Sequence, residues 1–330
     1  MLAPANLPAL DTYDRIIVAM SFGKDSLASH FALIEAGADP AKIEWWHHDV
    51  DGQEGSHLMD WPVTRSYGTK LADSLGMPLY HSWKEGGFER EMCRDNAPTA
   101  RNHFETPDGL RTAGGNSSKV GTRLRFPQVS ASLTTRWCSA YLKIDVASTA
   151  INNQERFLNK RTLFVTGERA QESAARAKYK TFEPHRTDLR HSPRRYRHVD
   201  HWRPIHSWSE EQVWAIIRRH GIVPHPVYYA GFGRVSCMNC IFMSNHQAAT
   251  INRYAPDRLQ ALATYETRFG CTIHRTLGVL DRAARGTPYE AATAEAMRLC
   301  LAEEYEGLIL ISPTDWKMPA GAFGDTCGPT

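Results

Sequence analysis

The sequence lacks long hydrophobic runs: none of its apolar stretches approaches the ~20 residues that a membrane-spanning helix requires. Residues 1–10 also lack the basic start and the long apolar centre of a signal peptide. No internal repeat or low-complexity segment competes with a globular interpretation. We therefore expect a cytoplasmic protein that has no membrane partner.

The sequence also has little excess charge and few cysteines. Its formal net charge of +3 is too small to indicate a nucleic-acid partner by itself. The seven cysteines are odd in number and unevenly spaced, which argues against a disulfide framework and favours metal ligands or reactive thiols. The 330 residues, 42% of them hydrophobic and 23% charged, can form one large soluble domain or a domain with an appendage.

A strand, a tight turn and a helix are predicted near the N-terminus. The five apolar residues 16–20 run directly into a polar, glycine-bearing turn, and apolar residues then recur at helical spacing from about Ser26 to Gly37. At such a junction the free N–H groups and the positive end of the helix dipole attract phosphate. We therefore predict a nucleotide loop at residues 21–26, with an ordinary polar turn as the alternative.

The side chains of this loop suit a nucleotide phosphate and its Mg²⁺. Gly23 lets the backbone approach the anion, Lys24 adds a positive charge, and two serines add hydroxyl groups. The spacing is not that of a Walker A loop, which places four residues between its first glycine and its Gly-Lys pair. It closely resembles the pyrophosphate loop of the ATP pyrophosphatases, Ser-Gly-Gly-Lys-Asp-Ser. The corresponding residues here are Ser21, Phe22, Gly23, Lys24, Asp25 and Ser26, with Phe22 in place of the first glycine.

The remaining pattern predicts an α/β fold. Further strands are expected at residues 42–48, 79–83 and 163–166, an amphipathic helix at residues 61–75 and another helix at residues 210–220. The alternation of strands and helices is typical of a doubly wound parallel sheet. Between residues 86 and 125 the pattern fails, which suggests a long functional loop or flap.

We divide the chain into a nucleotide-binding domain at residues 1–245 and a mainly helical C-terminal region at residues 246–330. Within the second part, helices are expected at residues 256–269 and 289–305. The Gly- and Pro-rich end, residues 312–330, is expected to be irregular.

Two acidic residues follow the second predicted strand. Asp49 and Asp51 lie where a carboxylate commonly reaches a nucleotide ribose or its metal ion, and we favour Asp49. His47 and His48 resemble a metal-binding pair. Adjacent residues of a strand point to opposite faces, however, which argues against a shared ligand role.

Cys237 and Cys240 have the two-residue gap that lets two thiolates face one metal ion or iron–sulfur cluster. A thioredoxin-like pair has the same spacing but follows a strand and opens a helix. Here a turn-rich segment, residues 231–234, precedes the pair, which favours ligation. Zinc and a buried reduced thiol pair are the alternatives to an iron–sulfur cluster.

Five ordered motifs resemble those of the phosphoadenosine phosphosulfate reductase family within the pyrophosphate-loop, adenine nucleotide α-hydrolase-like superfamily. After the nucleotide loop come Arg136-Trp137-Cys138 with Leu142-Lys143, then Gly167-Glu168-Arg169 with Glu172, Ser173 and Arg176, then Pro204-Ile205 with Trp208, and finally Cys237 with Cys240. The resemblance covers roughly residues 15–244. The ordered set is far more specific than any single motif.

The resemblance implies roles for individual residues. The nucleotide and the substrate phosphate would be bound by Gly167, Arg169, Ser173 and Arg176, with Glu172 holding an arginine in place. A solvated charged loop is the alternative. The implied catalytic residues are Lys24, Asp25, Arg169 and Glu172.

The resemblance also implies a [4Fe–4S] cluster held by Cys138, Cys237 and Cys240. Family members that hold such a cluster usually carry a Cys-Cys pair where this chain has Trp137-Cys138, so a complete four-cysteine set is missing. The fourth position could be filled by Cys271, His246 or Cys93, or one iron could stay open to carry sulfur.

Residues 176–203 form a basic stretch with interleaved aromatic residues. Nine Lys and Arg residues face three acidic ones, which leaves a local charge of +6 before four histidines are counted. Basic side chains suit phosphates and rings suit bases, so we predict a nucleic-acid surface, with DNA favoured over RNA. An arm that closes around a small nucleotide is the alternative.

Two family chemistries compete for this chain. The reductases generally lack the loop lysine, and they carry a C-terminal Glu-Cys-Gly-Ile/Leu-His segment of which only Cys327-Gly328 is present here. Because Lys24, Asp25 and Ser26 resemble the loop of ATP users, we expect an ATP pyrophosphatase. It would adenylate a substrate oxygen and support its replacement by sulfur, in the style of DNA phosphorothioate modification.

The alternatives are a phosphoadenosine phosphosulfate or adenosine phosphosulfate reductase and, third, a non-catalytic, cluster-binding subunit that docks nucleic acid. A cysteine desulfurase or another sulfur donor is the expected protein partner. The sulfur acceptor and a homodimeric state are left open.

Overall fold

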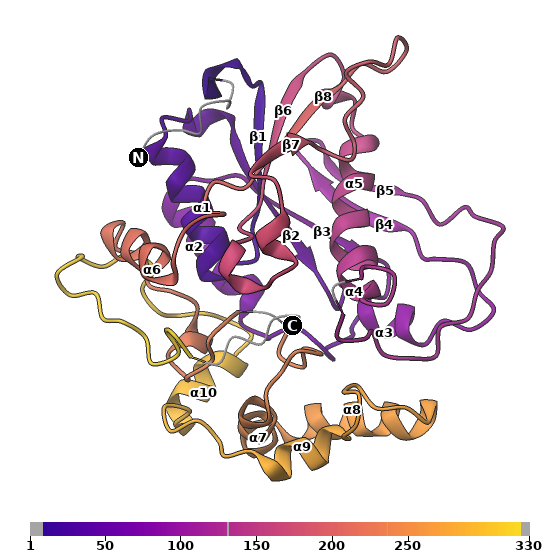
Figure 1. Cartoon of the computed structure of the whole chain (residues 1–330), viewed down its shortest axis with the longest axis vertical. Helices are drawn as coiled ribbons and strands as arrows, with labels where there is room; N and C mark the ends of the chain where they lie inside the picture. The colour runs from indigo at the N-terminus through magenta and orange to yellow at the C-terminus, as the bar shows by residue number, and fades with distance from the viewer. Residues whose placement is uncertain (1–8, 131, 236, 325–330) are drawn as a thin grey trace.

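One eight-stranded sheet forms the centre of the molecule (Figure 1). The computed structural model describes residues 9–130, 132–235 and 237–324. The strands are β1 (Arg15–Ala19), β2 (Ile43–Asp49), β3 (Leu79–Lys84), β4 (Asn102–Thr106), β5 (Gly109–Ala113), β6 (Arg161–Val165), β7 (Phe182–Pro184) and β8 (His198–Trp202). Their spatial order is β5-β4-β3-β2-β1-β6-β8-β7. The strands β3, β2, β1, β6 and β8 are parallel, whereas β4, β5 and β7 pair antiparallel at the two edges.

The strand order confirms the predicted doubly wound fold. From β1 the chain proceeds through β2 to β3 on one side, and β6 and β8 lie on the other side. In such sheets the ligand binds in the crevice at the carboxyl ends of the strands, at the point where the order reverses. Here that point lies between β1 and β6.

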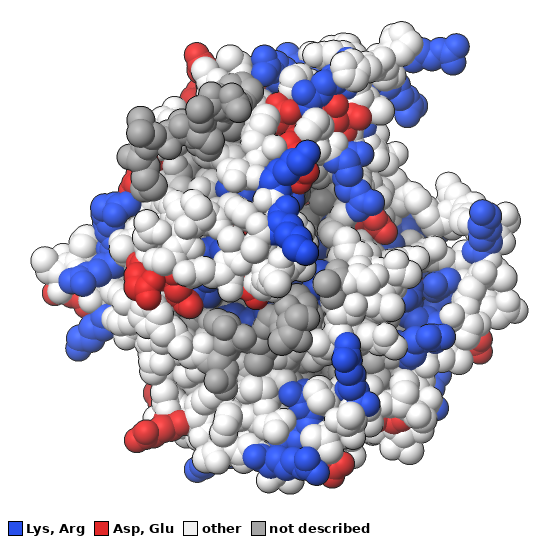
Figure 2. Space-filling view, viewed as in Figure 1, with Lys and Arg blue, Asp and Glu red and all other residues white. Residues whose placement is uncertain are grey.

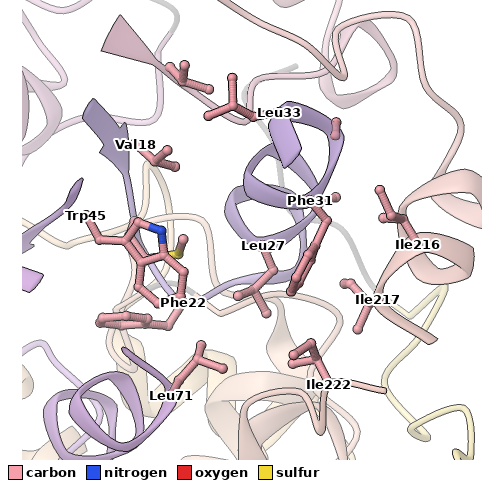
Figure 3. Close-up of a cluster of buried hydrophobic side chains, with 14 of the residues drawn as sticks. Val18, Phe22, Leu27, Phe31, Leu33, Trp45, Leu71, Ile216, Ile217 and Ile222 are labelled. Atoms are coloured by element: carbon pink, nitrogen blue, oxygen red, sulfur yellow. The ribbon is translucent and has the colours of Figure 1, made fainter. Parts of the chain in front are cut away.

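Helices cover both faces of the sheet. Among the described residues the α-helices are α1 (Lys24–Glu35), α2 (Thr64–Leu75), α3 (Gly87–Met92), α4 (Trp137–Ser139), α5 (Asp145–Asn152), α6 (Glu210–Arg219), α7 (Asn245–Tyr254), α8 (Pro256–Phe269), α9 (Val279–Arg285) and α10 (Ala294–Leu301), of which α7 to α10 form a separate group below the sheet in Figure 1. Strand β1 needs cover on both sides, because Ile16, Ile17 and Val18 are all fully buried and successive side chains point to opposite faces. Ile16 and Val18 pack with α1, α2 and α6 (Figure 3), and Ile17 packs with α5.

A third hydrophobic cluster joins the C-terminal helices to the cysteine-bearing segments. Residues of α7, α8, α9 and α10 pack there with Trp137 and Leu142. The C-terminal region is therefore mainly helical, as predicted, and α8 has the predicted bounds. Of residues 289–305, however, only those of α10 are helical, because Thr293 caps a helix that starts at Ala294. The domain boundary at residue 245 stays a prediction.

The predicted flap at residues 86–125 is wrong in part, because this segment adds α3 and a β-hairpin to the fold. Strand β4 pairs antiparallel with β3, and β5 pairs with β4. These strands lie at an edge, where only alternate residues of β4 are buried and all of β5 is at least partly exposed. Edge strands of this kind lack the apolar run that identifies a central strand.

No helix within the described parts of the chain combines the length and the apolar character needed to cross a bilayer.

Candidate functional site

The nucleotide loop lies between β1 and α1, at the predicted crevice. Helix α1 begins at Lys24, two residues before the predicted start, and its N-cap Gly23 has no side chain to accept from the first-turn N–H groups. The Ser26 hydroxyl donates to the Gly23 carbonyl at 2.9 Å and lies 3.3 Å from the Ser21 hydroxyl. A helix start without a side-chain cap is where a phosphate can supply the missing acceptors.

Lys24 is buried, and two carboxylates hold its ammonium group. Its Nζ lies 3.2 Å from Asp25 Oδ2 and 3.4 Å from Oε1 of Glu210, the first residue of α6. Burial alone lowers the pKa of Lys24, but Asp25, Tyr228 and Glu210 outweigh it and raise the pKa above its ordinary value. Lys24 is therefore charged at neutral pH, as phosphate binding requires.

Arg169 reaches the same carboxylate from the loop after β6. Its Nε donates to Asp25 Oδ1 at 2.6 Å, and its side chain is buried. Gly167 permits this approach, because a Cβ atom there would lie 2.6 Å from the Asp25 carbonyl oxygen. Burial raises the pKa of Asp25, but Lys24 and Arg169 outweigh it and lower the pKa. The structure thus brings together three of the predicted catalytic residues.

Glu172 organises the loop that carries Arg169. Its Oε2 accepts a hydrogen bond from the Arg169 N–H at 2.8 Å, and its carboxylate pairs with Arg176. The Ser173 hydroxyl accepts from the Arg176 N–H at 3.2 Å. These contacts give Glu172 an ordering role, whereas nucleotide contacts of Ser173 and Arg176 stay predictions.

Glu210 and Tyr228 belong to the site but were not predicted from the sequence. The Tyr228 hydroxyl accepts from the Lys24 N–H at 2.9 Å and from the Val235 N–H at 3.4 Å. Because Val235 leads into Cys237, this hydroxyl ties the nucleotide loop to the cysteine segment. Glu210 could have been found as the first acidic residue after the matched Trp208, but no sequence pattern marks Tyr228.

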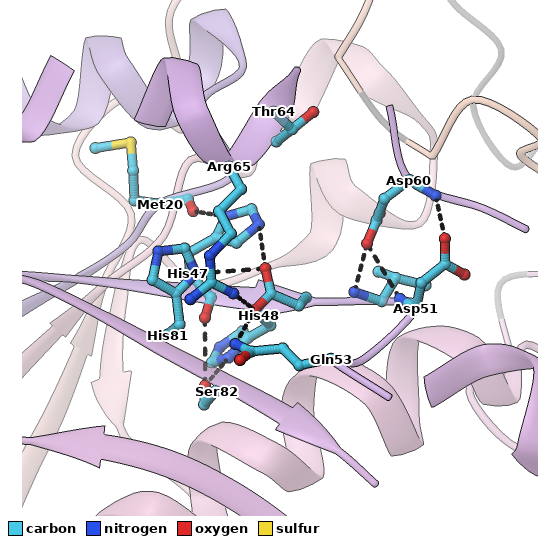
Figure 4. A network of polar contacts seen from close by, with 12 residues as sticks. Met20, His47, His48, Asp51, Gln53, Asp60, Thr64, Arg65, His81 and Ser82 are labelled. Carbon is cyan, nitrogen blue, oxygen red and sulfur yellow. Dashed lines mark hydrogen bonds and ion pairs between the residues drawn. The ribbon is translucent and has the colours of Figure 1, made fainter. Parts of the chain in front are cut away.

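Asp49 is the last residue of β2, and its partners Arg65, Gln53 and His81 are labelled in Figure 4. Its Oδ2 accepts from Arg65 and from Gln53, both at 3.1 Å, and its Oδ1 lies 3.3 Å from His81 Nδ1. Burial raises the pKa of Asp49, but His81 and His47 outweigh it and lower the pKa to about 2. Both carboxylate oxygens have protein partners, and the predicted contact with a ribose or its metal ion stays a prediction.

His47 and His48 have different partners, as expected for adjacent strand positions. His47 Nδ1 lies 2.8 Å from the Met20 carbonyl, whereas His48 Nδ1 lies 2.7 Å from the Ser82 hydroxyl. Burial lowers the pKa of His47 to about 4 and that of His48 to about 3. Both imidazoles are neutral at pH 7.

Asp51 and Asp60 close the loop after β2 by accepting each other's backbone N–H groups. The Asp60 N–H donates to Asp51 Oδ2 at 2.8 Å, and the Asp51 N–H donates to Asp60 Oδ2 at 3.1 Å (Figure 4). Burial and then the charge of Asp51 raise the pKa of Asp60 to about 7. Asp60 in turn raises the pKa of Cys237, so this carboxyl lies beside the cysteine segment.

The three predicted cluster ligands come together from two segments. Cys138 lies in α4, which continues through a π-helical turn at Ala140–Ile144 into α5, and such turns are frequent at functional sites. Burial and then Cys240 raise the pKa of the Cys138 thiol to about 11. Burial also raises the pKa of the Cys237 thiol. Lys143 lowers this pKa, whereas Cys240 and Cys138 raise it further. All three cysteines pack against the same hydrophobic cluster, so they lie in one region of the molecule.

A fourth ligand is not identified by the geometry. Cys93 and Cys271 lie at the margin of the same hydrophobic cluster, and His246 Nδ1 lies 3.0 Å from the Thr287 carbonyl. Within the described ranges, no group of three or more His, Cys, Asp or Glu side chains could hold a metal ion. The iron–sulfur cluster and its zinc alternative stay predictions, and Cys327 lies outside the described residues.

Strands β7 and β8 divide the predicted basic stretch between the two ends of the parallel strands. Strand β8 runs parallel to β6, from the pair Arg161 and His198 to the pair Val165 and Trp202. The segment before β7 therefore lies at the carboxyl ends of the parallel strands, where the crevice is. The connection from β7 to β8 lies at their amino ends (Figure 1). Strand β8 was not predicted from the sequence, because its buried Asp200 interrupts the apolar pattern.

Several arginines of this stretch are structural. Arg197 is buried and donates to the carbonyls of Thr187 and Ile151. Arg203 pairs with Glu168 and Glu183. The exposed basic residues are Lys178 and Lys180 near the crevice, and Arg186, Arg194 and Arg195 in the connection from β7 to β8 at the amino ends of the strands. Figure 2 shows several separate groups of Lys and Arg side chains on one face of the molecule.

Comparison with known proteins places these motifs in a family. A profile described as the phosphoadenosine phosphosulfate reductase domain matches residues 118–243, which include Cys138, the loop after β6 and the Cys237–Cys240 pair. The chain is also 36% identical to an uncharacterized 37.8 kDa protein in the gpa 5′ region of Escherichia phage 186, across 76% of this chain and 74% of that protein. The chain belongs to the phosphoadenosine phosphosulfate reductase family.

Proposed function

We propose that this protein is an ATP pyrophosphatase that adenylates a substrate oxygen and supports its replacement by sulfur. The observation that carries the proposal is the charged, buried Lys24 in the nucleotide loop, held by Asp25 and Glu210. Arg169 adds a second cation at the same place. Two fixed cations beside a helix start suit the phosphates of ATP.

The proposed reaction has two steps. A substrate oxygen attacks the α-phosphorus of ATP, the bond to the β-phosphate breaks, and pyrophosphate leaves. A sulfur nucleophile then attacks the adenylated centre, and AMP leaves with the original oxygen. Lys24 and Arg169 would stabilise the charge that develops on pyrophosphate, since preorganised cations favour such a transition state. Asp25 would hold both cations in position.

The cysteine site would serve the sulfur step. Cys138, Cys237 and Cys240 line the same apolar cluster, and the resemblance to the family assigns them to three positions of a [4Fe–4S] cluster. When bound, the cluster would hold the sulfur that a donor such as a cysteine desulfurase delivers. Zinc is the alternative occupant.

A nucleic acid is the proposed substrate. Lys178, Tyr179 and Lys180 are exposed and follow the loop that carries Arg169, so they lie on the crevice side of the sheet. Lysines can follow a phosphate backbone, and an exposed ring can stack on a base. The position of these residues supports the proposal that a polyanion enters the crevice beside them.

A sulfonucleotide reductase is the second candidate, because the matching profile is that of the reductase domain. To separate the two, anaerobically purified protein is incubated with labelled ATP and nucleic acid, or with phosphoadenosine phosphosulfate and a thiol reductant. The proposal predicts pyrophosphate and AMP from ATP. Sulfite from phosphoadenosine phosphosulfate, with no pyrophosphate from ATP, would establish the reductase instead.

A further inference from the structure

Phe22 occupies the nucleotide loop in an unusual backbone conformation. Its φ is +60°, in the left-handed region that favours glycine and that bulky side chains rarely adopt. Its ring is nevertheless fully buried. A strained residue persists only where its surroundings hold it in place, so the contacts of the ring determine whether the loop keeps this shape.

Helix α2 provides a slot for the ring at Gly68. A Cβ atom at Gly68 would lie 2.2 Å from Cζ and 2.3 Å from Cε2 of Phe22, far inside the distance at which atoms can pack. Glycine inside a helix destabilises it relative to alanine. The presence of glycine within α2 is therefore explained by the ring that lies against it.

The ring cannot leave this slot without disturbing other groups. It stacks on the His47 ring, with centroids 4.7 Å apart and planes at 23°, and it meets the edge of Tyr67 at 6.3 Å. Figure 3 shows Phe22 between Trp45 and Leu71, at the end of the same hydrophobic cluster. A methyl group at Gly68 would have to displace the ring and, with it, the backbone of the loop.

We propose that Phe22 and Gly68 act as positioning residues for phosphate binding. Phe22 directly precedes Gly23 and Lys24, which present the helix start and the ammonium group. By holding Phe22 at positive φ, the slot at Gly68 sets the direction in which the chain enters α1. The inference rests on the proposed nucleotide binding, and it assigns to α2 a role in shaping the phosphate site.

A double-mutant cycle tests this coupling, with affinities for ATP and for pyrophosphate measured by calorimetry. Gly68→Ala should weaken both ligands by about tenfold or more, because overpacking a filled site distorts its backbone. In the Phe22→Gly background the same change should have no effect, since the ring is gone. Thr69→Ala, at the exposed next position of α2, is the control and should bind both ligands as the wild type does.

Two results would overturn the proposal: wild-type affinity in Gly68→Ala, or an equal loss in both backgrounds. If Gly68→Ala does not fold, the double variant should fold and bind as Phe22→Gly does, and a double variant that also fails to fold would contradict the coupling. If the wild type binds neither ligand, the proposed function fails. The melting temperatures of the same four proteins then decide the coupling, which predicts that Gly68→Ala lowers the melting temperature only when Phe22 is present.

Discussion

At the scale of single residues, the charge balance around Lys24 is what the proposed phosphate site needs and an ordinary turn lacks. A lysine whose ammonium is buried would lose its charge unless carboxylates compensate, and here Asp25 and Glu210 do so. The same carboxylates would repel an incoming phosphate if Lys24 and Arg169 did not neutralise them. The four side chains therefore act as one charged unit.

Removing the ammonium group should weaken nucleotide binding. We expect Lys24→Ala to lower the affinity for ATP by about 1.5–3 kcal/mol, the range of a hydrogen bond to a charged group. Calorimetry with the exposed Lys160→Ala as the control would measure the difference. Equal affinities for ATP in the two variants would contradict the role of Lys24.

The sequence predicts the members of this unit that lie in recognisable motifs, which are Lys24 and Asp25 in the nucleotide loop and Arg169 in the loop after β6, and it misses side chains that no motif contains. Lys24 and Asp25 follow a buried strand in one short loop, so pattern and chemistry coincide there. Glu210 and Tyr228 contact Lys24 from about 190 to 200 residues away. Such contacts depend on how α6 and the segment after it pack, and no local pattern records that.

At the scale of secondary-structure elements, apolar content decides which strands the sequence reveals. β1, β2, β3 and β6 were predicted because the centre of a parallel sheet is covered on both faces. β5 and β7 are the edge strands and β4 lies next to β5 with only alternate residues buried, whereas β8 carries a buried Asp200 whose charge is satisfied by Tyr13 and Arg190. A sequence does not show the hydrogen-bond partners of a buried polar residue, so such a residue is mistaken for one in an exposed loop.

The connection before β8 depends on a buried arginine. Arg197 donates to the carbonyls of Thr187 and Ile151, and it also contacts Asn152 at the end of α5. Arg197→Ala should lower the free energy of unfolding by about 2–3 kcal/mol, because these buried acceptors lose a charged donor. Denaturant unfolding is the measurement, and the exposed Arg194→Ala should change it by no more than about 0.5 kcal/mol. Equal stabilities of the two variants would refute this anchoring role.

At the scale of the whole molecule, buried neutral histidines should make the fold sensitive to acid. Burial lowers the pKa of six histidines to about 3 or about 4; they are His30, His47, His48, His185, His201 and His225. Their pKa in the unfolded chain is about 6.5, so the unfolded state gains protons first as the pH falls. The stability that these groups contribute is present above about pH 6.5 and is lost as the pH falls towards 3.

One histidine can be tested by itself. His30 accepts a hydrogen bond from Trp45, which a glutamine amide oxygen can also accept. His30→Gln should reduce the loss of unfolding free energy between pH 7.5 and 5.5 by about 1.4 kcal/mol, measured by denaturant titration at both values. The exposed His57→Gln is the control. An unchanged pH dependence in His30→Gln would show that this imidazole is not held neutral in the fold.

The surface charges predict how a nucleic acid would bind. Lys178→Ala/Lys180→Ala should reduce the slope of log affinity against log salt for duplex DNA by about 0.9 for each phosphate that the variant no longer neutralises, because fewer counterions are released. Arg194→Ala/Arg195→Ala removes the same charge from the connection between β7 and β8, at the amino ends of the strands, and should reduce the slope less. Fluorescence anisotropy at several salt concentrations would compare the two. A larger effect of the second variant would place the DNA away from the crevice.

We propose that ATP is cleaved between its α- and β-phosphates at the crevice between β1 and β6. ATP labelled in either the α- or the γ-phosphate, incubated with the protein and DNA, tests this directly. We expect the α label in AMP or on the substrate and the γ label in pyrophosphate, with both products lost in Lys24→Ala. Recovery of the γ label as free phosphate with ADP, or unreacted ATP alongside sulfite formation from phosphoadenosine phosphosulfate, would contradict it.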